Sequence, residues 1–329
     1  MLLTMFSAKS YDRESFERAV GDELEIRFHD TRLDEHTAAL AEGADAVCVF
    51  VNDDVSRPTL VRLADLGVRL VALRCAGYNN VDLDAARDLG ITVARVPAYS
   101  PNAVAEHTLA LILGLNRKIH RAHQRVRDGN FSLDGLVGFD MVDKTAVVVG
   151  TGTIGAIVAR LLWHLRCEVI AVDPSGPDDH LAGLGVRYVE LDEALAVADV
   201  ITLNCPLNEA THHLIDAAAI AKMREGVMVV NTGRGGLIDT DALIDALKSG
   251  HIGSVALDVY EEEGDLFFED RSDEVIDDDT FARLLTFPNV LITAHQAFLT
   301  REALTAIAET TISNVRTVHA GEVCDNSVP

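Results

Sequence analysis

The sequence predicts an α/β protein made of two doubly wound, parallel-sheet domains. Short apolar runs alternate with amphipathic helical patterns along most of the chain, as in parallel sheets that helices cover on both faces. A glycine-rich turn at 150–155 follows one apolar run and opens a helical pattern. A length of 329 residues also exceeds one ordinary core, so two domains are expected.

The first hundred residues contain a series of apolar runs that we interpret as strands. No phosphate-type glycine turn follows the first of them. We therefore expect a flavodoxin-like domain that does not bind a nucleotide. The runs lie at 2–7, 24–29, 46–51, 70–74 and 91–96.

Pro101 is expected to begin a long helix that continues to about Gly129. Proline is tolerated in a first helical turn because the N–H that it lacks would have no partner there. This helix lies just before the glycine-turn segment, so it would connect the two domains.

The stretch from Thr145 to Asp173 has the pattern of strand, glycine turn, helix and strand, with an acid at its end. Gly150 would allow a sharp reversal, Gly152 a close approach to a pyrophosphate, and Gly155 close packing of the helix on the strand. The helix start carries about half a positive charge and would hold the phosphates. This combination predicts a Rossmann-type, dinucleotide-binding domain.

Asp173 lies about 20 residues beyond the turn, where a carboxylate can accept hydrogen bonds from the ribose of an adenosine. A carboxylate favours a free 2′-hydroxyl and repels a 2′-phosphate. The sequence therefore predicts NAD as the cofactor in preference to NADP.

Beyond Asp173 the alternation resumes, with further predicted strands at 187–190, 200–205, 227–231, 254–259 and 290–293. Together with the two opening strands they make a sheet of about seven strands, the size of a dinucleotide-binding domain. The last helical pattern, 301–319, most simply returns to the first domain. We thus expect an NAD-binding domain at 101–297, inserted into a discontinuous substrate domain at 1–100 and 298–329.

The net charge of −24 argues against nucleic acids and anionic membranes as partners, because both are polyanions. No apolar run approaches the roughly 18 residues of a membrane span. The acid-rich, lysine-poor composition fits either adaptation to high salt or a solvated surface with arginine favoured by codon bias. The dependence of activity and melting temperature on KCl would separate these two interpretations.

Five cysteines are scattered without CxxC spacing, which argues against a disulfide framework or a zinc site, so no metal is expected. The N-terminus lacks the basic start, long apolar centre and cleavage site of a secretory signal. A reducing cytoplasm is the default location.

Three polar residues follow predicted strands at the edge where open α/β sheets bind ligands: Arg234, Glu263 and His295. Each alone has a structural explanation, as a turn cap, a solvated acid or a histidine at a domain edge. Beside a nicotinamide they form a set that suits ketone reduction. A histidine can donate the proton, a carboxylate can orient the histidine and keep it charged, and an arginine can hold a substrate carboxylate.

Six motifs together resemble those of the D-isomer-specific 2-hydroxyacid dehydrogenases, and the similarity runs almost end to end. They lie at 74–84, 96–107, 150–155, 231–239, 257–263 and 294–300. Finer matches to the fermentative NAD-dependent D-lactate dehydrogenases of bacteria lie at 50–54, 130–133 and 265–270. The resemblance implies NAD as cofactor and a small 2-oxo or 2-hydroxy acid as substrate.

The resemblance also implies a role for each matching residue. His295 corresponds to the catalytic histidine, Glu263 to its paired acid and Arg234 to the substrate-binding arginine. The other implied substrate contacts are Ala76, Gly77 and Tyr99. The implied cofactor contacts are Gly150, Gly152, Ile154, Gly155, Asp173, Cys205, Pro206, Thr232, Gly233 and Asp258.

Two positions depart from the family pattern. Asn204 stands where a histidine is common, and Gly233 stands where a serine is common. Both departures concern the affinity for the cofactor rather than the reaction.

The implied reaction is the reduction of pyruvate to D-lactate by NADH, with His295 as proton donor, in a cleft between the domains. A close relative would instead reduce a bulkier 2-oxo acid, glyoxylate or hydroxypyruvate. The family also includes nucleotide-sensing corepressors, which the intact catalytic set argues against. Formate oxidation is disfavoured because that branch pairs its histidine with glutamine, where this chain has Glu263. Dimers are typical of the family, so a homo-oligomer is expected, a dimer or a dimer of dimers, with the helix from Pro101 as the natural contact.

Overall fold

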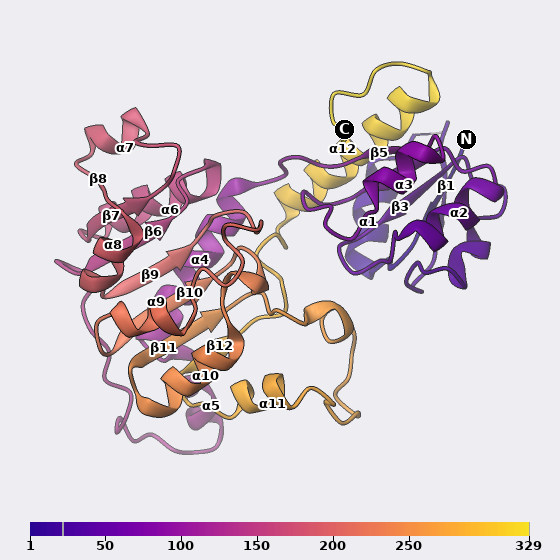
Figure 1. The fold of residues 1–329 in the computed structure, drawn as a ribbon. Coiled ribbons are helices and arrows are strands. Elements are labelled where there is room, and N and C mark those ends of the chain that lie inside the picture. The colour runs from indigo at the N-terminus through magenta and orange to yellow at the C-terminus, as the bar shows by residue number, and fades with distance from the viewer. Residues whose placement is uncertain (22, 329) are drawn as a thin grey trace. The chain divides into compact units, whose positions relative to one another are not determined.

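A computed structural model describes residues 1–21 and 23–328. The chain divides into two compact units, which are Met1–Ser100 with Phe298–Pro329, and Pro101–Ala297. Figure 1 shows that each unit is a parallel sheet with helices packed on it. The predicted fold class, two parallel-sheet α/β domains, is confirmed.

The first unit contains a five-stranded parallel sheet in the order β2-β1-β3-β4-β5, which is the flavodoxin-like order. Its strands are β1 Leu2–Met5, β2 Glu25–Phe28, β3 Ala46–Val49, β4 Leu70–Leu73 and β5 Thr92–Ala94. Its helices are α1 Ser10–Ala19, η1 Thr37–Ala41, α2 Arg57–Asp65, α3 Leu83–Asp88 and α12 Arg301–His319. The C-terminal helix α12, yellow in Figure 1, packs against α1 and β4, so the two ends of the chain build one unit.

The second unit contains a seven-stranded parallel sheet in the order β12-β11-β10-β9-β6-β7-β8. Its strands are β6 Thr145–Val149, β7 Glu168–Val172, β8 Arg187–Tyr188, β9 Val200–Leu203, β10 Val227–Asn231, β11 Ile252–Leu257 and β12 Val290–Ile292. Its helices are α4 Pro101–Asn116, α5 Ile119–Arg127, α6 Thr153–His164, α7 Asp179–Gly183, α8 Leu191–Val197, α9 Ala217–Lys222, η2 Gly235–Leu237, α10 Thr240–Ser249, η3 Glu263–Asp265 and α11 Asp279–Leu285. The strand order reverses at β6, so the switch point where such sheets bind ligands lies between β6 and β9.

The strands of the second sheet read as continuous apolar runs because both of their faces are buried. Along β6, Val147 and Val149 belong to one core, and Ala146 and Val148 belong to the other. Many of the helices begin at a side chain that accepts a backbone N–H of the first turn, as expected of helix caps. These caps are Asp82, Asp178, Asp216, Asp239, Asp278 and Thr300.

The prediction of one long helix from Pro101 to about Gly129 is wrong. Helix α4 ends at Asn116, and Lys118 adopts a left-handed conformation (φ 50°, ψ 39°) before α5 begins. The Asn116 side chain donates to the carbonyl oxygen of Phe139 at 2.8 Å and accepts from its N–H at 2.9 Å. Helix α5 buries none of its residues, so no packing holds it in line with α4.

Most predicted strands extend past their observed ends, as 200–205 does beyond Leu203, where the half-buried Asn204 and Cys205 already belong to the following loop. None of the described helices is long and apolar enough to cross a membrane. All five cysteines are free thiols, as their spacing predicts.

Candidate active site

The glycine turn after β6 has the geometry that a pyrophosphate requires. Gly150 has φ +87°, and a Cβ on it would lie 2.7 Å from the backbone N of Cys205. A Cβ on Gly155 would lie only 1.8 Å from the carbonyl oxygen of Gly150. A Cβ on Gly152 would meet nothing within 4 Å, so open space adjoins the backbone at the start of α6. Two glycines therefore shape the turn, while Gly152 borders the space that phosphates would fill, which fits a bound dinucleotide.

Asp173 follows β7 and turns back to this glycine turn. Its carboxylate accepts hydrogen bonds from the N–H of Thr151 at 2.7 Å and from the N–H of Ser175 at 2.8 Å. Burial opposes ionisation, but the hydrogen bonds from Thr151 and Ser175 lower the pKa of Asp173 below its ordinary value. The group is thus a carboxylate at neutral pH. The Thr151 hydroxyl also donates to it at 3.0 Å, and a ribose hydroxyl would take the place of this donor.

The other residues expected at the cofactor lie on neighbouring strand ends. Cys205 and Pro206 follow β9, and burial raises the pKa of the Cys205 thiol, so it packs as a neutral group. Thr232 and Gly233 follow β10, and the Thr232 hydroxyl pairs with that of Thr108 at 2.8 Å. Ile154 is half-buried in the first turn of α6.

Asn204, one of the two departures from the family pattern, carries a buried polar atom beside the glycine turn. The Nδ2 atom of Asn204 donates to the Thr202 carbonyl oxygen at 3.3 Å. A Cβ added to Gly155 would lie 3.3 Å from the Cβ of Asn204. Its Oδ1 atom is buried and has no hydrogen-bond partner within the described chain. An acceptor of this kind suits a hydroxyl donor on a ligand.

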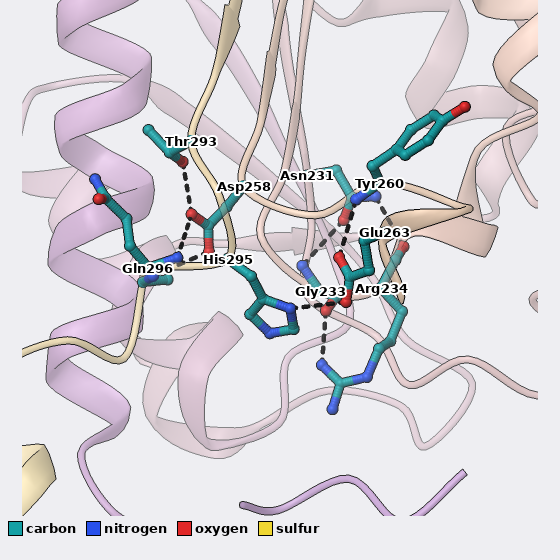
Figure 2. A network of polar contacts seen from close by, with 10 residues as sticks. Asn231, Gly233, Arg234, Asp258, Tyr260, Glu263, Thr293, His295 and Gln296 are labelled. Carbon is teal, nitrogen blue, oxygen red and sulfur yellow. Dashed lines mark hydrogen bonds and ion pairs between the residues drawn. The ribbon is translucent and has the colours of Figure 1, made fainter. Parts of the chain in front are cut away.

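Arg234, Glu263 and His295 follow three adjacent strands. Strand β11 pairs with β10 on one side and with β12 on the other, so the loops after all three leave the same edge of the sheet. The Nδ1 atom of His295 lies 2.8 Å from the Oε1 atom of Glu263, and both side chains are largely buried. Figure 2 shows these two side chains pointing toward one another.

A chain of contacts joins Arg234 to this pair. Gly235 packs against the backbone of Tyr260 so closely that a Cβ on it would lie 2.1 Å from the Tyr260 carbonyl carbon. The Tyr260 N–H donates to the Oε2 atom of Glu263 at 3.1 Å, which leaves Oε1 for His295. The Arg234 guanidinium donates to the Gly233 carbonyl oxygen at 2.8 Å, as Figure 2 shows. One network of the second unit thus contains the imidazole, the carboxylate and the guanidinium.

Asp258 supports the turn that carries His295. Its carbonyl oxygen accepts the N–H of His295 at 2.7 Å, and its carboxylate accepts the N–H groups of Gln296 at 2.9 Å and Ala297 at 3.0 Å. These contacts stabilise His295 in a left-handed conformation (φ 51°), which is uncommon for a residue with a Cβ. Asp258 is fully buried, so it is placed to shape this loop.

His107 of α4 is a residue that the sequence did not identify. Its Nε2 atom lies 3.2 Å from both the Thr293 hydroxyl and the Asp258 Oδ1 atom. Burial raises the pKa of Asp258, but the hydrogen bonds from His107 and Thr293 outweigh it and lower that pKa. The only sequence signal for His107 was its place at the end of the 96–107 motif, where a polar residue enters an apolar helix.

Ala76, Gly77 and Tyr99 lie in the first unit, after β4 and β5. Arg95 donates to the Ala76 carbonyl oxygen at 2.8 Å, and the Cys75 thiol donates to that of Gly77 at 3.3 Å. The Tyr99 ring meets the Phe298 ring edge-on, with the centroids 6.3 Å apart. Both segments thus follow carboxyl ends of strands, where an α/β sheet offers backbone N–H groups to ligands.

Comparison with known proteins adds an independent line of support. The family model described as "D-isomer specific 2-hydroxyacid dehydrogenase, NAD binding domain" matches residues 109–297. A 2-hydroxyacid dehydrogenase homolog of Haemophilus influenzae is 54% identical over 329 residues, spanning 100% of this chain and 99% of the relative. The D-lactate dehydrogenase of Escherichia coli is 53% identical over 331 residues, spanning 100% of both.

Solved structures agree with these relatives. The structure of the pyruvate reductase of Chlamydomonas reinhardtii matches with a TM-score of 0.94 at 45% identity, covering 99% of this chain and 98% of that one. The resemblance inferred from the motifs is thereby confirmed, and NAD is the cofactor that the matched domain binds. The chain belongs to the D-isomer-specific 2-hydroxyacid dehydrogenases, a family of NAD-dependent oxidoreductases.

Proposed function

We propose that this protein reduces pyruvate to D-lactate, with NADH as the hydride donor. The observation that carries the proposal is the 2.8 Å hydrogen bond between His295 and Glu263 at the edge of the NAD-binding sheet. An imidazole held by a carboxylate there is suited to protonate the oxygen of a carbonyl group that is being reduced. The names of two relatives, D-lactate dehydrogenase and pyruvate reductase, support pyruvate as the substrate.

His295 is the proposed proton donor. Its Nδ1–H group donates to Glu263, so its Nε2 atom is the one that carries the proton to the substrate oxygen. The Glu263 carboxylate fixes the orientation of the ring. In the reverse direction, His295 takes the proton from the hydroxyl group of D-lactate.

Arg234 is the proposed anchor of the substrate carboxylate. A guanidinium has five N–H donors in a fixed fork, and the bond to Gly233 uses one of its two terminal nitrogens, Nη1. The remaining donors can bind a carboxylate bidentately, which also orients the carbonyl group toward His295. Ala76, Gly77 and Tyr99 are further proposed substrate contacts.

The geometry of the second unit supports the proposed cofactor contacts. When bound, NADH supplies the hydride that reduces the carbonyl carbon. The backbone from Gly150 to Gly155 would hold the pyrophosphate, and Asp173 the adenosine ribose. The other proposed contacts are Ile154, Cys205, Pro206, Thr232, Gly233 and Asp258.

A direct assay tests the proposal. NADH oxidation is followed with pyruvate, and the product is typed with chirally specific lactate assays. We expect D-lactate, and a kcat/KM for pyruvate above that for branched, aromatic and other small 2-oxo acids. Formation of L-lactate would refute the stereochemistry, and a higher kcat/KM for glyoxylate, hydroxypyruvate or a bulkier acid would replace pyruvate as the substrate.

We further propose that the protein forms a homo-oligomer, a dimer or a dimer of dimers. The segment after α4 exposes several apolar side chains, which is typical of a surface that another protein chain covers. The exposed fractions are 58% for Ile119, 55% for Val126, 75% for Phe131, 79% for Leu133 and 82% for Val137. Sedimentation velocity at micromolar concentration would test this, and a monomer would contradict it.

The cytoplasm is the proposed location. Its support is the set of free thiols, since an oxidising compartment would favour disulfides. Fractionation of the source cells, with the protein detected by antibody, would test the location.

A further inference from the structure

A cluster of two histidines and one acid lies outside the proposed catalytic set. His212 and His213 belong to the loop after β9, and Glu261 to the loop after β11. The potential ligand atoms, one from each residue, all lie within 4.8 Å of one another. The spacing of the cysteines predicts no metal site, and this cluster escaped prediction because it contains no cysteine and joins distant loops.

The cluster is held in place by contacts that do not involve His212. The Nε2 atom of His213 lies 2.6 Å from the Oε1 atom of Glu261, and the Thr240 hydroxyl donates to the other carboxylate oxygen at 3.0 Å. The His213 N–H donates to the Gly236 carbonyl oxygen at 2.8 Å. Two of the three groups are therefore oriented before any ion binds, and Thr240 supports Glu261 as residues around metal ligands do.

His212 completes the cluster from the solvent side. It is exposed, and its ring stacks on that of His213 with the centroids 3.9 Å apart and the planes at 26°. The side chains of His213 and Glu261 are 34% and 26% exposed. An ion can thus reach the cluster from water and retain water as a further ligand.

We propose that His212, His213 and Glu261 bind a divalent transition metal ion, with Zn²⁺ as the best match. Two imidazoles and one carboxylate form a donor set that zinc accepts, whereas Mg²⁺ and Ca²⁺ require mainly oxygen ligands. The net charge of −24 attracts cations of any kind to the surface, whereas the two imidazoles of this cluster favour zinc over magnesium.

The position of the site indicates that the ion stabilises the loops around it. Gly236, which the His213 backbone contacts, lies two residues after Arg234, and Glu261 lies two residues before Glu263. The bound ion would therefore join the loop after β9 to the loop that carries Glu263, while the His213 N–H already joins it to the loop that carries Arg234. We expect it to raise the melting temperature of the protein without taking part in the reaction.

The test uses the full-length chain without an affinity tag, freed of metal by a chelator. Zn²⁺ is titrated calorimetrically, and Co²⁺ is added as a spectroscopic probe of ligand number. The variants are His212→Ala and Glu261→Gln, and the control is His180→Ala, which removes an exposed histidine of α7 in the same unit. All titrations are repeated in excess Mg²⁺.

We expect the wild type and the His180→Ala control to bind one Zn²⁺ per chain, with a melting temperature that rises with the zinc concentration. His212→Ala should keep the metal-free melting temperature, because the bond between His213 and Glu261 remains, yet bind zinc at least about tenfold more weakly. Equal zinc affinity in His212→Ala and the wild type, or displacement of zinc by Mg²⁺, would overturn the proposal. So would the absence of binding to the wild type.

Discussion

The Nδ1 atom of His295 lies 2.8 Å from the Oε1 atom of Glu263, while the N–H of His295 donates to the carbonyl oxygen of Asp258 at 2.7 Å. Two acids thus act on one histidine in different ways. Glu263 orients the ring, and Asp258 shapes the backbone turn that presents the ring. The position of the proposed proton donor therefore depends on Asp258, at the end of β11, as well as on Glu263.

Replacing His295 with glutamine tests the proton donor. Glutamine can still donate to Glu263, but it cannot transfer a proton to the substrate oxygen. We expect kcat for pyruvate reduction to fall by about 10² to 10⁴-fold, the usual contribution of general acid catalysis. NADH affinity, measured by fluorescence titration, should stay close to that of the wild type. His180→Gln serves as the control, and turnover within a few-fold of the wild type in His295→Gln would remove the assignment.

Replacing Arg234 with lysine tests bidentate recognition. Lysine keeps the positive charge but presents a single point donor instead of a planar fork. A hydrogen bond to a charged group contributes about 1.5 to 3 kcal/mol, so kcat/KM for pyruvate should fall roughly 10 to 150-fold. The dissociation constant of NADH should change little. An equal loss of NADH and pyruvate affinity would instead indicate a general disruption of the loop after β10.

The stability of the folded protein should depend on the ionisation of Asp258 at acid pH. The pKa of Asp258 in the folded protein is below the ordinary value of 3.8. Its contribution to the free energy of unfolding is therefore complete above that ordinary value and is lost as the pH falls through the folded pKa. Asp258→Asn should lower the melting temperature at pH 7 and make its decline below about pH 4 less steep than in the wild type. If the melting temperatures of the two proteins fell equally with pH in that acid range, Asp258 would not have this role.

Asp173 predicts the choice of cofactor. Its carboxylate is ionised and adjoins the turn that would hold the phosphates, so it should repel the 2′-phosphate of NADPH. In Asp173→Asn this repulsion disappears, while the amide can still bond to a ribose hydroxyl. The ratio of kcat/KM for NADH over NADPH should fall by at least about tenfold, or 1.4 kcal/mol. An unchanged ratio would place the ribose elsewhere.

The sequence was sufficient to predict the residues at the carboxyl ends of the strands, but not the features that depend on tertiary contacts. The apolar runs and the acid after β7 were sufficient to place the glycine turn, and the strand ends located Arg234 and His295 at one edge. The end of α4 at Asn116 was not predictable, because it depends on the bonds to Phe139, far along the chain. His107 was missed for a similar reason, since its partner Asp258 lies in a distant strand loop.

Alanine substitutions in the glycine turn can distinguish Gly155, which is required for packing, from Gly152, which faces the proposed ligand. In Gly155→Ala the new Cβ would lie 1.8 Å from the Gly150 carbonyl oxygen, so the backbone must shift and the melting temperature should fall markedly. In Gly152→Ala the new Cβ meets nothing within 4 Å, so the melting temperature should stay near that of the wild type. The same methyl group would enter the space assigned to the pyrophosphate, so the dissociation constant of NADH should rise at least about tenfold, or 1.4 kcal/mol.

Gly183→Ala at the end of α7 is the matched control, because its Cβ also meets nothing within 4 Å and it lies outside the segment from Gly150 to Gly155. It should alter neither the melting temperature nor the NADH affinity by much, since alanine is a better helix former than glycine. Wild-type NADH affinity in Gly152→Ala would mean that the phosphates do not lie against this backbone. A folded Gly155→Ala with unchanged stability would mean that the turn can relax, and that the third glycine is not required for packing.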